Sequence, residues 1–134
     1  MSKERVPDRG AMKRPDSVEE AVEIVKKHRF EAPDKVGEVE FYTKEFTSIC
    51  PVTGQPDFSK VIIKYNPDKY CIESKSLKYF LWSFREEGEY CESLSQKLAE
   101  LIKYAINPTY VTVRVEQNIR GGIGLNAETT LTQD

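Results

Sequence analysis

The chain has 134 residues, of which 39% are hydrophobic and 31% charged, and its formal net charge is -2 at pH 7 with a pI near 5.6. This balance predicts one folded domain rather than a disordered or membrane-spanning chain, since no apolar run approaches the roughly 20 residues of a membrane helix. The acidic balance argues against direct nucleic-acid binding, which needs a basic surface, and favours a small-molecule substrate.

The three cysteines are Cys50, Cys71 and Cys91, and their odd number and wide spacing predict free thiols rather than a disulfide framework. With His28 as the sole histidine and no paired cysteine spacing, we expect no metal site. Free thiols suit a reducing compartment, and the charged first residues have no apolar segment behind them. We therefore expect a cytoplasmic protein without a secretory signal.

Residues 1–16 carry many charges together with prolines and a glycine, which predicts a flexible N-terminal arm. A single domain is expected over residues 17–134. Ser17 and Glu20 have the spacing of a capping box, and the apolar residues that follow recur at helical spacing. They predict a helix over residues 18–28.

The middle of the chain alternates strand and loop signals. Alternation predicts a strand over residues 37–42, and two prolines and a glycine then predict a fixed, irregular loop over residues 46–58. A second strand is expected over residues 59–65. An apolar stripe predicts a helix inside residues 74–86, ended by Gly88.

Apolar residues from 94 to 105 recur at helical spacing and predict a third helix, closed by an Asn-Pro pair. Residues 110–116 alternate and predict a strand. The glycines within 120–122 predict a turn or bulge, with a fourth strand beginning at 123–125. Residues 127–134 are predicted to be irregular.

This order of elements predicts an α+β fold with a mainly antiparallel four-stranded sheet covered by two helices. The edges of such a sheet must be blunted or paired. We therefore expect copies of the chain to pair as a homo-oligomer.

Cys50 is the first candidate for chemistry. It lies in the predicted irregular loop, seven residues before Asp57. A thiolate attacks electrophilic carbon, and a nearby carboxyl group can hand a proton to the developing anion. The alternative is a buried cysteine and an aspartate that caps a turn.

Two further clusters are candidates for binding. Lys75 and Lys78 place two cations on one face of a helix start, which favours a phosphate-bearing cofactor, although ordinary solvated lysines explain them as well. Glu92, which follows Cys91, offers two carboxylate acceptors of the kind that hold a guanine-like edge. The alternative is an exposed glutamate at the beginning of a helix.

Two blocks of the sequence, FTSICPVTGQPDF over residues 46–58 and CIESKSLKYFLWSFREEG over residues 71–88, resemble the signatures of the NADPH-dependent 7-cyano-7-deazaguanine reductases, single-domain type. RGGI at 120–123 also matches the family, and the resemblance covers about residues 36–125. It implies the tunnelling fold, in which subunits join their sheets into a barrel. The active sites of such an oligomer lie between subunits.

The resemblance implies an enzyme that reduces a nitrile to an aminomethyl group in tRNA queuosine biosynthesis, with NADPH as hydride donor. Cys50 matches the nucleophile that forms a thioimide, and Asp57 matches the acid that protonates the nitrile nitrogen. The positions that match the base-binding residues are Ile72, Glu73, Ser74, Cys91 and Glu92. The residues expected to hold the NADPH phosphates are Lys75, Lys78 and Arg120.

One departure from the family is Cys91, which stands where the family usually has histidine. The nearest alternative function is that of an archaeosine synthase-like amidinotransferase, which acts on the same base in tRNA. That branch lacks the ESKSLK motif found at residues 73–78. A non-catalytic purine- or pterin-binding module of the same fold is the other alternative, and its mark would be loss of the nucleophile.

Overall fold

The protein is described here by a computed structural model that covers residues 13–134. The flexible arm predicted over residues 1–16 therefore lies mostly outside the described residues. The elements, in chain order, are α1 Val18–His28, β1 Phe30–Glu31, β2 Val39–Ile49, β3 Pro56–Asn66, β4 Tyr70–Cys71, α2 Ser74–Trp82, α3 Cys91–Ile106, β5 Tyr110–Arg120 and β6 Ile123–Thr132.

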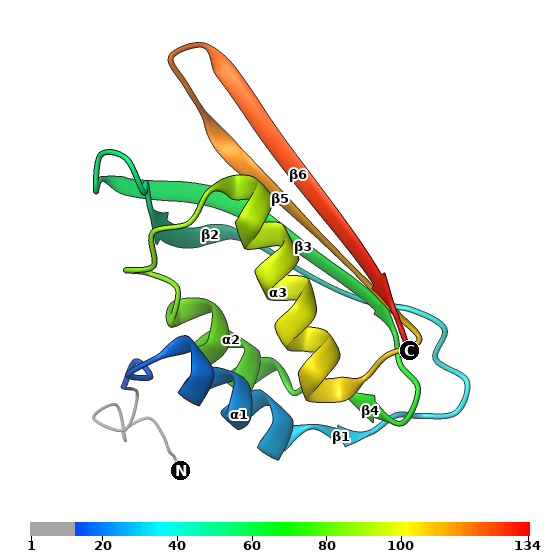
Figure 1. The fold of residues 1–134 in the computed structure, drawn as a ribbon. Helices are drawn as coiled ribbons and strands as arrows, with labels where there is room; N and C mark the ends of the chain where they lie inside the picture. The colour runs from blue at the N-terminus through cyan, green and yellow to red at the C-terminus, as the bar shows by residue number, and fades with distance from the viewer. Residues whose placement is uncertain (1–12) are drawn as a thin grey trace.

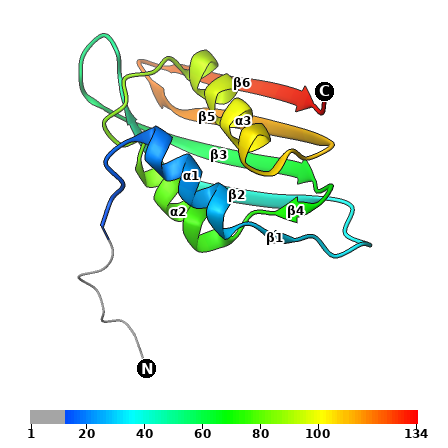
Figure 2. The same ribbon diagram turned by 60° about the horizontal axis from the view of Figure 1, so that its bottom comes forward.

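The main sheet has four antiparallel strands in the order β2-β3-β5-β6, which confirms the predicted α+β class. Strands β2 and β6 form its two edges. Helices α2 and α3 lie across one face, with α1 packed against both helices (Figures 1 and 2). The two short strands β1 and β4 pair with each other beside α1. Among the described helices, none is both long and apolar enough to span a membrane.

Helix α1 begins and ends where the sequence predicts. The Ser17 hydroxyl accepts the N–H of Glu20 at 3.0 Å, which satisfies one of the free amides of the first turn. Its buried residues, which include Val18 and Val25, face α2 and α3. Helices of this length depend on such burial, because isolated short helices are marginal in water.

The core lies between the helices and the sheet. Alternate residues of β3 and β5 are buried, as expected for strands with one covered face. On β3, Tyr65 is fully buried and its hydroxyl accepts the N–H of Ile72 at 2.9 Å. Phe84 contacts Phe80 edge-on and Phe46 at a tilt, which joins the end of α2 to β2.

Three predicted boundaries are wrong. β2 continues to Ile49 and β3 begins at Pro56, so the irregular loop shrinks from residues 46–58 to 50–55, because cross-strand pairing overrides the proline signal. Helix α2 ends at Trp82 and continues only as turns. Residues 127–132 are ordered as part of β6 by pairing with β5, not irregular.

Candidate active site

Cys50 begins the tight loop that joins β2 to β3. Its N–H donates to the carbonyl of Gln55 at 2.8 Å, and its carbonyl accepts the N–H of Gly54 at 2.9 Å. Gly54 has a φ of +75°, a backbone conformation that glycine adopts without strain. On the other side, Ile49 forms a parallel bridge with Gly88, in the connection from α2 to α3. Hydrogen bonds within the loop therefore hold Cys50 on one side, and the bridge from Ile49 to Gly88 holds the chain on the other.

Hydrogen bonds activate the Cys50 thiol. The Thr53 hydroxyl and the backbone N–H groups of Thr53 and Val52 lower the pKa of Cys50 from 9.0 to about 7, with a smaller contribution from Arg120. The side chain is only 9% exposed. A large share of the sulfur is therefore thiolate near neutral pH, which is the reactive form. The sequence analysis did not identify Thr53 as a functional residue. The signal that could have found it is its position in a turn three residues after Cys50.

Asp57 lies beside this loop, near the beginning of β3. It pairs with Ser48 across the β2–β3 ladder, and both side chains are buried, with Asp57 2% exposed. Its Oδ1 accepts a hydrogen bond from Nη1 of Arg120 at 2.5 Å. A buried carboxylate needs such a partner. The structure thus brings Cys50, Asp57 and Arg120 together, although Arg120 was expected only at a cofactor phosphate.

Ser59 adds an unexpected feature to the same strand face. Its hydroxyl is 1% exposed and is the one buried side-chain oxygen or nitrogen without a hydrogen-bond partner within residues 13–134. It lies two residues from Asp57, on the same side of β3. Ser59 therefore adds a polar group to the buried strand face that carries Asp57.

Cys91 and Glu92 begin α3 at this end of the sheet. The Cys91 thiol donates to the carbonyl of Val115 at 3.6 Å. Burial, together with the negative charges of Glu92 and Asp57, raises the pKa of Cys91, so its thiol stays neutral. Glu92 is exposed and remains available to a ligand. Cys91 is part of the core and is a weaker donor than the histidine of the family.

The remaining predicted site residues gather at the beginning of α2, away from Cys50. Glu73 caps this helix, and its carboxylate accepts the N–H groups of Lys75 and Ser76 at 2.7 and 2.9 Å. These hydrogen bonds outweigh partial burial and lower the pKa of Glu73. Ile72 is buried, whereas Ser74, Lys75 and Lys78 are exposed.

The length of β3 separates Cys50 and Asp57 from the residues at the beginning of α2. Asp57 lies near the beginning of this strand, and Tyr65, whose hydroxyl holds Ile72, lies near its end. Eight steps along an extended strand span roughly 27 Å. Within one copy of the chain, the beginning of α2 is therefore held near the end of β3 and Cys50 lies near its beginning.

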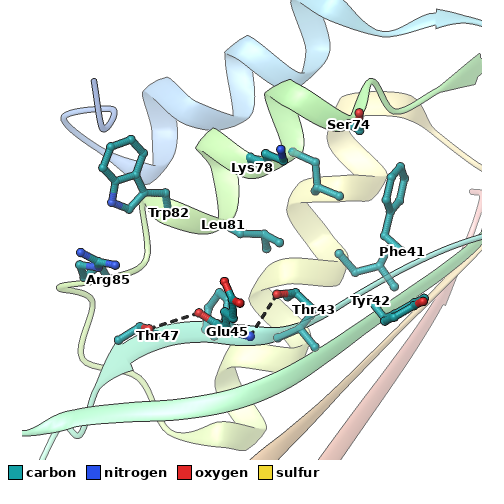
Figure 3. Close-up of a pocket in the computed structure, with 14 residues that line it drawn as sticks. Phe41, Tyr42, Thr43, Glu45, Thr47, Ser74, Lys78, Leu81, Trp82 and Arg85 are labelled. Atoms are coloured by element: carbon teal, nitrogen blue, oxygen red, sulfur yellow. Dashed lines mark hydrogen bonds between the residues drawn. The ribbon is translucent and has the colours of Figure 1, made fainter. Parts of the chain in front are cut away.

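A groove of about 510 Å³ runs between α2 and the edge strand β2 (Figure 3). Thr43 and Glu45 lie on its β2 side, and Ser74, Lys78 and Trp82 lie on its α2 side. The groove thus combines apolar walls with cationic and hydroxyl groups, which suits a ligand with a ring and phosphates.

The beginning of α2 presents two ammonium groups to solvent. Lys75 and Lys78 are both exposed there. The N–H groups of Lys75 and Ser76 already bind Glu73, so the lysine side chains, not the helix amides, supply the free donors. Within residues 13–134, no group of three histidine, cysteine or acidic side chains is placed to hold a metal ion.

Comparison with known proteins gives consistent similarities. A family model described as "QueF-like protein" matches residues 56–134. The NADPH-dependent 7-cyano-7-deazaguanine reductase of Thermomicrobium roseum is 44% identical over 91 residues, covering 68% of this chain and 71% of that protein. The enzyme of the same name from Chlorobaculum tepidum is also 44% identical over 91 residues, covering 68% and 78%.

One solved structure is similar in fold. The crystal structure of the archaeosine synthase QueF-Like in the apo form matches with a TM-score of 0.68 and 26% sequence identity. The match covers 72% of this chain and 95% of that one. This likeness confirms the tunnelling fold expected from the sequence. The joining of subunit sheets into a barrel stays a prediction.

Proposed function

The chain belongs to the QueF-like protein family, and we propose that it uses NADPH to reduce the nitrile of 7-cyano-7-deazaguanine to an aminomethyl group, in cytoplasmic queuosine biosynthesis. It is then an oxidoreductase that acts on a small deazaguanine base. The observation that carries the proposal is that one end of the β2–β3 hairpin carries both the Cys50 thiol, whose pKa is lowered to about 7, and the buried carboxylate of Asp57.

The first step needs no reductant. The Cys50 sulfur attacks the nitrile carbon, a C–S bond forms, and the carbon–nitrogen triple bond becomes a double bond. Asp57 delivers a proton to the nitrogen, which gives a thioimide. A nitrile is a poor hydride acceptor, and covalent attachment divides one difficult step into easier ones. NADPH, when bound, supplies the hydrides that complete the reduction.

Binding of the base and the cofactor involves the residues at the beginning of α2. We propose that Glu73 and Ser74 of one copy hold the base over Cys50 and Asp57 of another, with Lys75 and Lys78 toward the phosphates. The roughly 27 Å along β3 from Asp57 to Tyr65, whose hydroxyl holds Ile72 beside Glu73, supports this arrangement. The exposed edges of β2 and β6 are the natural places for copies to pair.

The second candidate is an archaeosine synthase-like reaction, in which ammonia takes the place of hydride. The similarity in fold to an archaeosine synthase favours it. The ESKSLK motif at residues 73–78, which that branch lacks and which places Lys78 in the groove, favours the reductase. A non-catalytic binding module would have no use for an activated thiol.

The test is NADPH consumption by the purified protein with 7-cyano-7-deazaguanine, followed by absorbance and by mass spectrometry of the product. We expect two NADPH per nitrile, with all consumption lost in Cys50→Ala. Cys71→Ala is the matched control, because that thiol is buried in β4 and has no part in the bond formed by Cys50, and it should retain turnover. A thioimide that forms without NADPH consumption, and that ammonia releases as an amidine, would contradict the reductase.

A further inference from the structure

Arg120 occupies an unusual position for a residue expected only to bind cofactor. Its guanidinium is about half exposed (53%), yet it donates at 2.5 Å to a carboxylate that is 2% exposed. The same side chain also helps to lower the pKa of the Cys50 thiol. One cation therefore pairs with Asp57 and favours the thiolate of Cys50.

The backbone sets this position. The β5–β6 ladder shifts register between Gln117 and Arg120, so β5 bulges at its end. Gly121 and Gly122, both with positive φ, then reverse the chain immediately after Arg120. Pairing of β5 with β3 ends at Gln117 opposite Ser59, which leaves room for Arg120 to reach Asp57.

Burial explains why the contact matters. A carboxylate removed from water is unfavourable unless a donor satisfies it, and removing one partner of a buried pair leaves the other uncompensated. The described structure shows one ion pair for Asp57, and it is with Arg120. Without the guanidinium, the carboxylate would be free to turn toward water, away from the sulfur.

We propose that Arg120 is a positioning residue for thioimide formation, holding the Asp57 carboxylate beside Cys50 so that one proton passes from the sulfur to Asp57 and then to the nitrile nitrogen. This inference rests on the proposed function. The S–H bond and one π bond of the nitrile break, the S–C bond and the N–H bond form, and Asp57 ends as it began. No oxidant or reductant takes part.

Positioning of Asp57 and binding of a cofactor phosphate change different kinetic quantities. A phosphate ligand changes the KM for NADPH and leaves the cofactor-free step alone. A positioning residue for Asp57 changes the cofactor-free step itself. The ionisable residues on the segments around Cys50 come from four elements or connections and are Asp57, Glu87, Cys91, Glu92 and Arg120.

The experiment compares wild type, Arg120→Gln and Arg120→Lys in two assays without NADPH. The first is the rate of covalent adduct formation with 7-cyano-7-deazaguanine, by intact mass. The second is the pH dependence of Cys50 alkylation by iodoacetamide, by peptide mass. Arg114→Gln is the matched control, because this arginine lies on the same strand and pairs with Glu116 at 2.7 Å.

We expect Arg120→Gln to slow adduct formation by at least about tenfold, since positioned proton transfer contributes factors of this size or more. Its alkylation midpoint should move to higher pH, because a cation that favours the thiolate is lost. Arg120→Lys should recover part of both effects, and Arg114→Gln should match wild type. Urea unfolding checks that each variant is folded. If Arg120→Gln does not fold, the rate of adduct formation in Arg120→Lys, which keeps the charge, tests the proposal instead.

Adduct formation at the wild-type rate in Arg120→Gln, with only the KM for NADPH raised, would overturn the proposal. If wild type forms no adduct at all, the proposed function fails, and the positioning role fails with it. In that case, a higher alkylation midpoint in Arg120→Gln than in wild type would show that Arg120 lowers the pKa of Cys50 although the protein does not react with this nitrile. The two failures are therefore distinguishable.

Discussion

Thr53 and Cys50 lie three residues apart in one turn, and the Thr53 hydroxyl makes the largest contribution to the lowered pKa of the Cys50 thiol. The same Thr53 oxygen accepts the N–H of Gln55 at 3.2 Å, which fixes its direction. The side chain that activates the nucleophile is thus held by the loop that carries it.

Replacement of Thr53 should therefore reduce the reactivity of Cys50 near neutral pH. In Thr53→Val the hydroxyl is lost while the shape is kept, so the pKa should rise from about 7 toward its ordinary value of 9.0. The measurement is the rate of Cys50 alkylation from pH 6 to 10. Thr53→Ser keeps the hydroxyl and should follow wild type, and an unchanged midpoint in Thr53→Val would exclude the hydroxyl as the cause.

Gly54 tests the conformation of the same loop. A Cβ at Gly54 meets no atom within 4 Å, but its φ of +75° strains any other residue. Gly54→Ala should lower the free energy of unfolding by about 1–2 kcal/mol. Gly37 is also open, with no positive φ, so Gly37→Ala is the control and should lose nothing comparable. Equal losses in the two variants, measured by urea unfolding, would rule out strain at Gly54.

Glu73 should affect stability as well as substrate binding, because it caps α2. Glu73→Ala should cost about 1 kcal/mol of unfolding free energy at pH 7. The folded state lowers the pKa of Glu73 below its ordinary 4.5, so its stabilisation is present above that value and is lost as the pH falls through the lower folded value. Urea unfolding at pH 7 and pH 3 should therefore show a smaller difference between variant and wild type at the acidic pH.

Phe84 should be one of the more sensitive core positions. It is fully buried between Phe80 and Phe46, and truncation leaves a cavity. Phe84→Ala should cost about 3–5 kcal/mol. Phe58 is 52% exposed, and Phe58→Ala should stay within about 0.5 kcal/mol, as surface positions do. Thermal unfolding of both variants checks the contrast, and a similar loss in both would contradict the assignment of the core.

A site built from two copies predicts complementation. Cys50→Ala should be inactive for want of the nucleophile, and Lys78→Ala should turn over poorly at low NADPH, because a lost phosphate contact raises the KM for the cofactor. When the two variants are produced together with different tags, mixed assemblies should regain activity, because some sites receive an intact Cys50 and an intact Lys78. Mixed assemblies of normal size that remain inactive would show that both residues must come from one chain.

Local signals in the sequence predicted much of this structure. The capping box gave α1 its bounds because the Ser17 hydroxyl and the N–H of Glu20 are three residues apart. Cys50 and Asp57 were predicted to lie near each other because one tight loop separates them. Alternation found the centre of β3 and β5, where one face is buried throughout.

Signals between distant residues were missed. Residues 127–132 are polar and alternate only weakly, and they become a strand by pairing with β5. The contact of Arg120 with Asp57 joins residues 63 positions apart, which no local pattern reveals. Likewise, the distance between Cys50 and Glu73 depends on the length of β3, not on their spacing in the chain.

The order of the strands also has a consequence for folding. Strands β2 and β3 form one hairpin and β5 and β6 another, whereas the seam between β3 and β5 joins segments separated by α2 and α3. Contacts across so long a connection require a costly loop closure, so we expect the hairpins to form early and the seam late. Asp57 lies on one side of this seam and Arg120 on the other. We therefore expect their pairing to form late, so that a chain arrested before that stage holds Cys50 and Asp57 in one hairpin without Arg120.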